Sequence, residues 1–338
     1  RQTVLWSMKI ARKLIFGLLA VVSASAVSAS MPHPGSEVFL DKAEQEHGLD
    51  RETVAAILSE ARFQQSIVDA MTRPAEAKPW HQYRPIFLTP KRIEEGVRFW
   101  RENRALIDRA AQEFGVDPRF IVAIIGVETF YGRITGNYRV IDALTTLGFY
   151  YPQELKRDRS DFFAGEFLQF MLLGEEENLP LTEVTGSYAG AMGMGQFIPS
   201  SYRAYAVDFD GSGHRDLWRS TPDAVGSVAN YLHQHGWKAG EPVATRAFPS
   251  GEAKNGSTLS GGYKPSMTVA EIAAAGYQAS PSLDAERQAA LLELEEAERK
   301  IYWLVFDNFY VITRYNRSPL YAMAVYQLAE EIAAGMSE

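Results

Sequence analysis

Residues 120–132 read F-I-V-A-I-I-G-V-E-T-F-Y-G, and this stretch decides what kind of fold to expect. Asp117 and Pro118 stand just before it, as a helix-capping side chain and a proline at the first helical position. Apolar residues then recur at helical spacing through the stretch. It therefore predicts an apolar helix within a mainly helical region.

Glu128 falls on the apolar stripe of this helix. Relative to Ile121, the residues Ile124 and Ile125 stand at i+3 and i+4, and Glu128 stands at i+7. A carboxyl group between apolar walls has its charged form disfavoured, so its pKa should rise, which suits a general acid near neutral pH. The alternative is a structural glutamate satisfied by backbone or tyrosine donors, and the pattern alone does not exclude it.

A second stretch, residues 186–202, reads G-S-Y-A-G-A-M-G-M-G-Q-F-I-P-S-S-Y. Its glycines remove side chains where another group must approach the backbone closely. The glycine spacing is a poor match to a dinucleotide-binding motif, because no strand precedes it and no βαβ unit surrounds it. Two interpretations stay open: close packing between helices, or the floor of a cleft in which Ser187 and Gln196 bind a polar ligand.

Helical patterning extends on both sides of these stretches. We expect helices from 36 to 114, interrupted by an irregular proline-containing connection at 73–90, and helices again from 117 to 237. Residues 239–276 are rich in Gly, Pro, Ser and Thr and predict a small lobe of short strands. The elements expected after this lobe are an acidic helix at 284–300, a segment that starts extended at 301–313 and a final helix at 321–334.

The composition excludes several classes of protein. The chain has 338 residues, 46% of them hydrophobic, as in a folded protein with a sizeable core. A formal net charge of −8 argues against general binding to nucleic acid or to anionic membranes. The absence of cysteine excludes disulfides, thiolate metal sites and a cysteine nucleophile, and we expect no lipid-modified cysteine at a processed N-terminus.

Residues 1–29 have the features of upstream residues followed by a signal peptide. Met8 opens a basic region, residues 14–22 form an apolar run too short to span a bilayer, and Val27, Ser28 and Ala29 form a plausible cleavage site. The alternative is an N-terminal membrane anchor. We expect export, signal removal and no stable membrane insertion afterwards.

Residues 208–219, D-F-D-G-S-G-H-R-D-L-W-R, have the spacing of an EF-hand loop, with Gly213 at the turn in position 6. The expected oxygen donors are Asp208, Asp210, Ser212 and the carbonyl of His214. Position 12 should be Glu but is Arg219, so a strict EF-hand fails there. The alternative is a turn rich in aspartate that holds no metal.

Acid–base catalysis often uses a pair of carboxylates, and no clear partner for Glu128 is present in the sequence. Asp142 favours a structural hydrogen bond, and Glu166 also favours a structural role. The run Glu175–Glu177 is typical of a solvated helix face. A mechanism with one carboxylate is therefore reasonable.

Six stretches occur in a fixed order along residues 117–328: G-V-E-T-F-Y-G, V-I-D-A-L-T-T-L, G-S-Y-A-G-A-M-G-M-G-Q-F-I-P-S-S-Y, A-V-D-F-D-G-S-G-H, D-A-V-G-S-V-A-N-Y-L and I-T-R-Y-N-R-S-P-L-Y-A-M-A-V. Together they resemble the B-type lytic transglycosylases, exported bacterial enzymes that cut the glycan strands of peptidoglycan. The resemblance implies a mainly α (α+β) fold, with a lysozyme-like helical catalytic core, an additional helical domain and a small β lobe. The boundaries we expect are a helical domain at 30–115, the catalytic core at 116–238, the β lobe at 239–305 and a C-terminal segment returning to the core at 306–338.

The resemblance also implies roles for particular residues. Glu128 becomes the single catalytic acid and base. The residues implied to line the sugar cleft are Ser187, Gln196, Phe197, Tyr231, Tyr315, Asn316 and Tyr321. Asp223 becomes the distal ligand of a structural Ca²⁺ site, in place of the missing glutamate, and no organic cofactor is implied.

The implied reaction cleaves the MurNAc-GlcNAc β-1,4 bond and leaves 1,6-anhydro-MurNAc ends. An ordinary glycosidase needs two carboxylates, so with Glu128 alone the substrate's own 2-acetamido group is expected to assist. The expected location is the periplasm, and the expected partners are peptidoglycan glycan strands and other cell-wall enzymes. Two alternatives stay open: a hydrolytic muramidase on the same fold, and a non-catalytic peptidoglycan-binding scaffold. The segment 153–162 looks longer than the family's usual one, and its Lys156, Arg157 and Arg159 either meet acidic stem peptides or form a solvated surface loop, the interpretation that the sequence favours.

Overall fold

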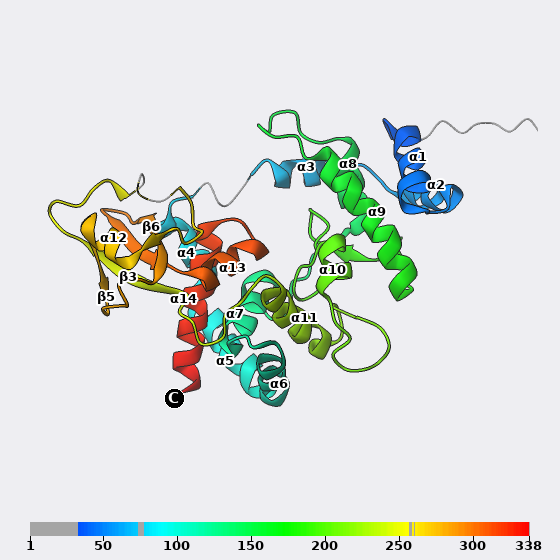
Figure 1. Ribbon diagram of the computed structural model, residues 1–338. Helices are drawn as coiled ribbons and strands as arrows, with labels where there is room; N and C mark the ends of the chain where they lie inside the picture. Colours follow the sequence, from blue (N-terminus) through cyan, green and yellow to red (C-terminus); the bar gives the residue numbers. More distant parts are fainter. Residues whose placement is uncertain (1–32, 74–77, 257–258, 260, 338) are drawn as a thin grey trace, which may run out of the picture.

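The computed structural model describes residues 33–73, 78–256, 259 and 261–337 (Figure 1). The predicted signal peptide, residues 1–29, lies outside the described residues. Within the described part, no helix is both long enough and apolar enough to cross a membrane. The fold is mainly helical with a small sheet, as the sequence predicts.

The N-terminal third is helical, as predicted for residues 36–114. Its helices are α1 (Ser36–His47), α2 (Arg51–Glu60), α3 (Gln65–Met71), α4 (Trp80–Phe87), α5 (Pro90–Glu102) and α6 (Arg104–Phe114). Side-chain caps start two of them: Asp50 accepts a hydrogen bond from the backbone N–H of Thr53 at 2.8 Å, and Thr89 accepts one from Arg92 at 3.1 Å. These caps fix where α2 and α5 begin.

Helix α4 corrects the prediction that residues 73–90 are irregular throughout. Pro85 lies inside this helix, where a proline removes one backbone donor. The helix persists because it buries two large side chains, Trp80 and Tyr83, which are 1% and 2% exposed. Tertiary burial here outweighs the local preference that the prolines suggest.

Helix α7 (Pro118–Thr129) forms the centre of the helical part. It packs against α5 and α6, and also against α11 (Thr221–Gln234) and α14 (Pro319–Met336). Every residue from Phe120 to Val127 is buried, because neighbouring helices cover this helix on all sides. The remaining helices of this region are α8 (Val140–Phe149), α9 (Ser160–Glu177) and α10 (Pro199–Tyr205).

Two short strands, β1 (Tyr138–Arg139) and β2 (Thr185–Gly186), pair antiparallel. They bring the segment after α7 against the segment that starts the glycine-rich stretch. Gly136 has a φ of 94°, and a Cβ there would lie 2.1 Å from the carbonyl oxygen of Gly186. The close approach therefore requires glycine at position 136.

A five-stranded antiparallel sheet forms the small β lobe. Its strands lie in the order β4-β6-β7-β3-β5. They are β3 (Ala244–Pro249), β4 (Met267–Thr268), β5 (Tyr277–Ser280), β6 (Gln288–Glu295) and β7 (Lys300–Val305), with helix α12 (Val269–Ala274) between β4 and β5. One face of the sheet packs on α12 and the other joins the helical core.

Strand β6 shows that the acidic helix predicted at 284–300 is wrong. The strand pairs with β7 from Ala290 to Glu295. Its adjacent leucines point to opposite faces of the sheet: Leu291 packs in the apolar cluster with α12, and Leu292 packs in the main helical core. With both faces buried, an A-A-L-L run no longer shows the alternation that marks a half-exposed strand. Packing on both faces of the sheet therefore outweighs the helical preference of these residues.

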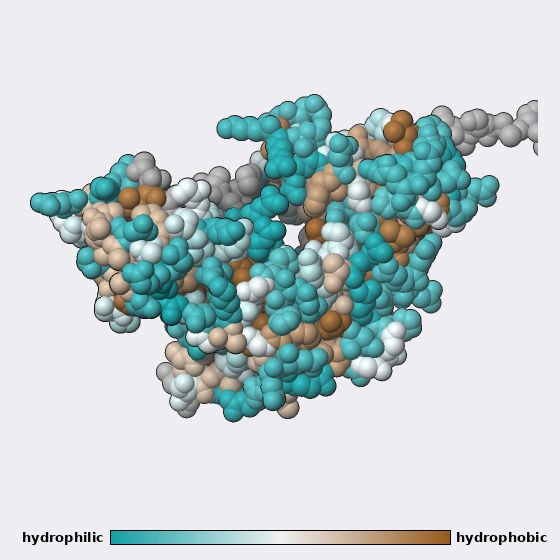
Figure 2. Space-filling model, viewed as in Figure 1, coloured by the Kyte–Doolittle hydropathy of each residue, from teal (hydrophilic) through white to brown (hydrophobic). Residues whose placement is uncertain are grey.

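The C-terminal segment returns to the helical part. Residues 301–313 start extended in β7 and continue into α13 (Asp307–Tyr315), and the predicted final helix is α14. Figure 1 shows α13 and α14 between the sheet and the helices around α7. The face seen in Figure 2 is largely hydrophilic and is hollowed between the side with the sheet and the side with α8 and α9.

Candidate active site

Glu128 lies in the last turn of α7 and, unlike the eight residues before it, is partly exposed. Burial of its carboxyl group raises its pKa to about 7. The hydroxyl of Tyr321 donates a hydrogen bond to Oε1 and favours the charged form, which lowers the pKa. The raised pKa agrees with the expectation from the sequence, and a carboxyl group in this state can both donate and accept a proton near neutral pH.

The chain reverses sharply just after Glu128. Phe130, Tyr131 and Gly132 are all in left-handed conformations, with φ of 50°, 61° and 85°. Tyr131 folds back over Gly126, where a Cβ would lie 2.6 Å from the tyrosine ring, and its hydroxyl donates to the carbonyl of Arg92 at 2.7 Å. Gly126 therefore makes room for the ring that holds the reversal in place.

The glycine-rich stretch faces this end of α7. The hydroxyl of Ser187 accepts hydrogen bonds from the backbone N–H groups of Ala189 at 3.2 Å and Ala191 at 3.0 Å, so it shapes the turn itself. The amide of Gln196 donates to the carbonyls of Thr135 at 3.1 Å and Gly193 at 3.0 Å. Its Nε2 is therefore engaged by the protein.

Three aromatic rings form a wall beside this stretch. The ring of Tyr231 lies 5.7 Å from that of Phe197 and 4.6 Å from that of Tyr315, measured between centroids. The hydroxyl of Tyr231 donates to the carbonyl of Arg314 at 2.6 Å, and that of Tyr315 donates to the carbonyl of Gly195. These bonds fix the orientation of the rings.

A cavity of about 740 Å³ opens along this wall. Of the residues that the resemblance places in the sugar cleft, the structure brings five to it: Gln196, Phe197, Tyr231, Tyr315 and Asn316. Ser187, Tyr321 and Glu128 are not among its lining residues, but Glu128 is close enough to Tyr315 of the wall that burial and the charge of Glu128 together raise the pKa of that tyrosine. Tyr321 is 3% exposed and contacts the carboxyl group of Glu128 instead.

The other acids considered from the sequence are engaged in structural contacts. Asp142 accepts hydrogen bonds from the backbone of Arg62 at 2.8 Å and from Arg139, and Glu166 accepts one from the backbone of Ser200 at 2.9 Å. Glu177 is not solvated as predicted, because it pairs with Arg215 at 2.5 Å and its side chain is only 7% exposed.

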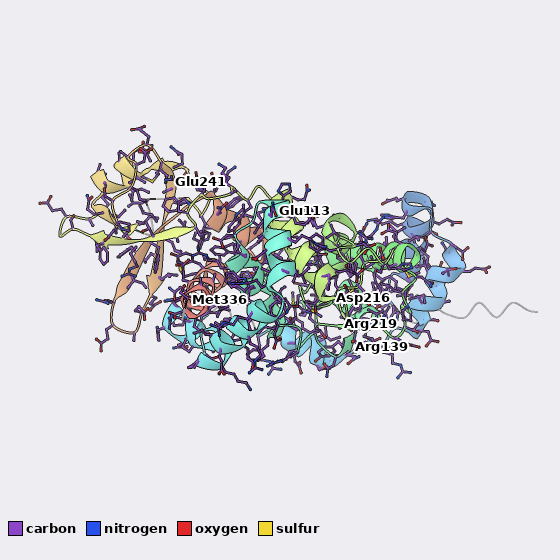
Figure 3. The ribbon with its side chains drawn as sticks, turned by 90° about the horizontal axis from the view of Figure 1, so that it is seen from below. Glu113, Arg139, Asp216, Arg219, Glu241 and Met336 are labelled. Carbon is purple, nitrogen blue, oxygen red and sulfur yellow. The ribbon has the colours of Figure 1, made fainter. Side chains whose placement is uncertain are left out.

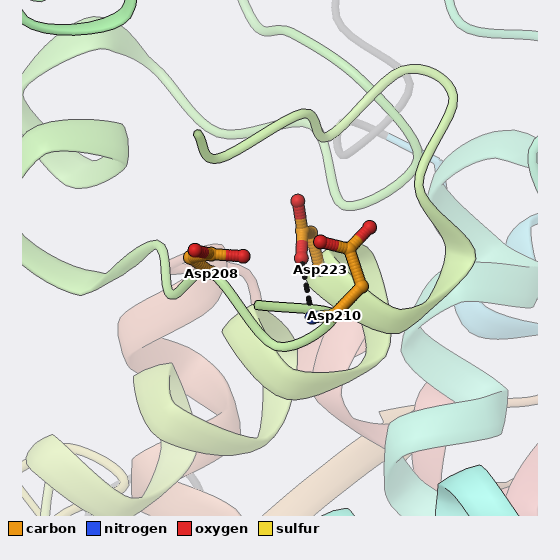
Figure 4. Close-up of side chains that lie close together, drawn as sticks. All are labelled: Asp208, Asp210 and Asp223. Carbon is orange, nitrogen blue, oxygen red and sulfur yellow. Dashed lines mark hydrogen bonds between the residues drawn. The ribbon is translucent and has the colours of Figure 1, made fainter. Parts of the chain in front are cut away.

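The acidic loop, residues 208–219, brings Asp208 and Asp210 close to Asp223 of α11 (Figure 4). One oxygen from each of Asp208, Asp210 and Asp223 lies within 4.8 Å of the others. Asp223, at the start of α11, accepts hydrogen bonds from the backbone of Phe209 at 2.7 Å and of Asp216 at 2.8 Å, and so closes the loop. Oxygen donors of this kind fit Ca²⁺, which prefers carboxylate and carbonyl ligands.

Two further predicted donors lie in the same loop. The hydroxyl of Ser212 donates to the carbonyl of His214 at 3.1 Å, so these two oxygens are adjacent. The imidazole of His214 points elsewhere, 3.8 Å from Glu177. Asp216 pairs with Arg219 at 2.9 Å, and the two lie together in the view from below (Figure 3). Asp216 is not part of the cluster.

Comparison with known proteins decides the family. A family model described as a transglycosylase SLT domain matches residues 33–330. The Escherichia coli (strain K12) protein named membrane-bound lytic murein transglycosylase B is 43% identical, in an alignment that covers 89% of this chain and 83% of that protein. The chain belongs to the B-type lytic transglycosylases.

Solved structures agree with this transglycosylase family. The soluble lytic transglycosylase SltB1 from Pseudomonas aeruginosa is 46% identical, with a TM-score of 0.82, covering 90% of this chain and 100% of that one. The Escherichia coli Slt35 structure, in complex with calcium, is 42% identical with a TM-score of 0.80, covering 91% and 95%. SltB3 from Pseudomonas aeruginosa, in complex with NAG-NAM-pentapeptide, is 32% identical with a TM-score of 0.76, covering 89% and 79%.

In this transglycosylase, four arginines border the cavity. Arg157 and Arg159 come from the segment before α9, and Arg314 and Arg317 from the end of α13 and the turn after it. Among the described residues, none of the four forms an ion pair. The segment predicted as a solvated loop therefore lies at the cavity. Sequence reasoning missed Arg314 and Arg317, although both flank Tyr315 and Asn316 in the T-R-Y-N-R motif.

Proposed function

We propose that this transglycosylase cleaves the MurNAc-GlcNAc β-1,4 bond of peptidoglycan without water and forms 1,6-anhydro-MurNAc ends. The observation that carries the proposal is the buried carboxyl group of Glu128, a partly exposed residue at the end of a buried helix, with its pKa raised to about 7. Membership of the lytic transglycosylase family supports the choice of substrate and reaction.

The reaction needs one group that is first an acid and then a base. Glu128 first donates its proton to O4 of the leaving GlcNAc while the bond from C1 to O4 breaks, and the 2-acetamido oxygen of MurNAc bonds to C1. The Glu128 carboxylate then takes the proton of the O6 hydroxyl of MurNAc. O6 attacks C1, releases the acetamido oxygen and closes the anhydro ring, so Glu128 ends protonated as it began.

The hydrogen bond from Tyr321 supports the second role of Glu128. It favours the charged carboxylate, whereas burial favours the neutral acid. These two opposing effects leave the pKa at about 7, so at neutral pH Glu128 reaches either protonation state at little cost in free energy. The proposed mechanism needs this balance because the same oxygen atoms give and receive a proton in one cycle.

The cavity offers surfaces for both parts of a peptidoglycan strand. Its aromatic wall of Phe197, Tyr231 and Tyr315 supplies ring faces and edges on which sugars pack. Its lining holds four arginines and two aspartates, Asp158 and Asp161, so positive charge is in excess and is available for the carboxylates of stem peptides. Digestion of intact peptidoglycan beside peptide-free glycan tests the second assignment, since only the peptide-bearing substrate should lose rate when Arg157 and Arg159 are both changed to alanine.

We also propose a structural Ca²⁺ at the acidic loop, and an exported, periplasmic location. Asp208, Asp210 and Asp223, with Ser212 and the carbonyl of His214, would hold the ion. Its positive charge would offset the repulsion between the clustered carboxylates and so stabilise the loop. The calcium complex of Slt35 supports this assignment.

Mass spectrometry of peptidoglycan digested by the purified chain tests the proposed function. We expect muropeptides with 1,6-anhydro ends, each lighter by one water molecule than the hydrolysed product. Reducing ends would instead identify a muramidase, and a chain that binds peptidoglycan without releasing fragments would be a scaffold. Either of these results would overturn the proposal.

A further inference from the structure

The segment from Gly193 to Gln196 is held by side chains that come from several elements. Three successive carbonyls in it accept hydrogen bonds from side chains. Gly193 accepts from the amide of Gln196 at 3.0 Å, Met194 from the hydroxyl of Thr129 at 2.8 Å, and Gly195 from the hydroxyl of Tyr315. This segment carries Gln196 into the cavity, so its position sets one wall of the site.

Thr129 is the member of this set that comes from the helix of Glu128. It is the last residue of α7 and is 1% exposed. Its hydroxyl lies 2.8 Å from the carbonyl of Met194 and 3.2 Å from that of Ile125 in its own helix, so its one hydrogen is best donated to the nearer carbonyl of Met194. The same hydroxyl accepts a hydrogen bond from the backbone N–H of Gly132 at 2.9 Å. This one hydroxyl therefore links the end of α7 to the chain reversal at 130–132 and to the cavity-lining segment at 193–196.

These hydrogen bonds of Thr129 matter because α7 ends at this residue, so no further helical turn supports the side chain of Glu128. The backbone leaves the helix at Phe130, and the next two residues are also left-handed. The orientation of the last turn then depends on side-chain links to its neighbours. Arg92 supplies one, from its guanidinium to the carbonyl of Gly126 at 3.2 Å, but that link leads to α5 and away from the cavity wall.

We propose that Thr129 is a positioning residue, which fixes the last turn of α7, and with it the carboxyl group of Glu128, relative to residues 193–196 through its hydrogen bond to Met194. The proposal rests on the proposed function, in which Glu128 transfers the proton. A displacement of about 1 Å at a reacting group can cost on the order of a hundredfold in rate. Thr129 thus acts through Glu128 and does not itself touch the substrate.

The titratable and charged groups that face this end of α7 are few. Tyr321 of α14 donates to Glu128, and burial together with the charge of Glu128 raises the pKa of Tyr315 at the end of α13. Arg92 of α5 reaches the carbonyl of Gly126, over which the ring of Tyr131 also packs. Lys91 and Arg133 lie over the ring of Phe130. Thr129 carries no charge. Any change in the pKa of Glu128 after substitution of Thr129 therefore reports a change in position or in access of water.

Thr129→Val and Thr129→Ser test the proposal. Valine keeps the shape and removes the hydroxyl, so kcat should fall by about ten- to a hundredfold with little change in KM. Water entering the loosened site should lower the pKa of Glu128 from about 7 towards its ordinary value. Serine keeps the hydroxyl, and should restore both the rate and the pKa.

Thr146→Val is the matched control. Thr146 is a fully buried threonine of α8 whose hydroxyl accepts a hydrogen bond from the backbone of Gln64 at 3.1 Å. Its substitution should lower the melting temperature but leave the pKa of Glu128 unchanged. If Thr129→Val does no more than this control, Thr129 is merely structural and the proposal fails.

The pKa of Glu128 is best followed by carbon NMR of chain labelled at glutamate carboxyl groups, since this readout needs no substrate. A wild-type chain without anhydro products would overturn the proposed function, and the NMR titration would still decide the role of Thr129. An unshifted titration in a folded Thr129→Val chain would contradict the positioning role. A downward shift that Thr129→Ser reverses would support it.

Discussion

At the scale of single residues, two opposing influences act on Glu128. Its carboxyl group is surrounded by protein, which favours the neutral acid, and it accepts a hydrogen bond from Tyr321, which favours the carboxylate. The sequence predicted the first influence from the apolar stripe of the helix. It did not predict the second, because Tyr321 lies 193 residues away and was expected to line the sugar cleft.

Tyr321→Phe should raise the pKa of Glu128 above about 7, because the variant loses a donor that stabilises the charged form. The free enzyme needs Glu128 protonated, so kcat/KM falls as pH rises through this pKa. The alkaline limb of the profile should therefore move to higher pH.

Tyr326→Phe is the control for this change. It removes a hydroxyl from the same helix, one that donates to the carbonyl of Ala244 at 3.2 Å. Its profile should match that of the wild type. An alkaline limb that stays in place in Tyr321→Phe would show that Tyr321 does not set the pKa of Glu128.

At the scale of elements, helix starts and glycine positions were predictable, whereas packing reversed two local preferences. Asp117 and Pro118 begin α7 as expected, with the Asp117 side chain accepting a hydrogen bond from the backbone of Arg119 at 3.1 Å. Helix α4 forms despite Pro85, and β6 forms despite a helical composition. Both exceptions bury large side chains against partners that are distant in sequence.

The acidic loop gives a prediction at this scale. Bound Ca²⁺ should raise the melting temperature, because an ion that binds only the folded state adds about 2.7 kcal/mol to the free energy of unfolding at roughly a hundred times its Kd. A chelator should reverse the shift. In Asp208→Ala/Asp210→Ala the shift should disappear, while the rate well below the melting temperature changes little.

The control for the loop is Glu44→Ala/Glu46→Ala, which removes two exposed acids from α1 and should keep the Ca²⁺ response. An unchanged melting temperature at millimolar Ca²⁺ would mean that the loop is only a turn. Loss of activity on chelation, with the protein still folded, would place the ion in the catalytic cycle.

At the scale of the whole molecule, the order of six motifs predicted the fold class and the family, since it covers most of the chain. The cavity was only partly predictable. It combines α9, the glycine-rich stretch, α11 and α13, and the arginines on its two sides lie more than 150 residues apart in the sequence. No local sequence pattern predicts that these distant arginines lie at the same cavity, so the positive charge there is seen only in the three-dimensional structure.

Glu128 also affects the stability of the whole molecule. Its folded pKa lies above the ordinary value of 4.5, so the folded state keeps a proton that the unfolded state has lost. Stability contributed by this group therefore falls as pH rises from 4.5 to about 7. Glu128→Gln removes that penalty, and its melting temperature at neutral pH should equal or exceed that of the wild type.

The rate of anhydromuropeptide release by Glu128→Gln tests the central claim most directly. Glutamine has nearly the same shape but cannot deliver or accept the proton, and general acid–base catalysis contributes about 10²–10⁴-fold. A residue that serves as both acid and base should reach the upper end, while peptidoglycan binding persists. A folded Glu128→Gln chain that kept more than about a tenth of the wild-type rate would show that Glu128 is not the acid.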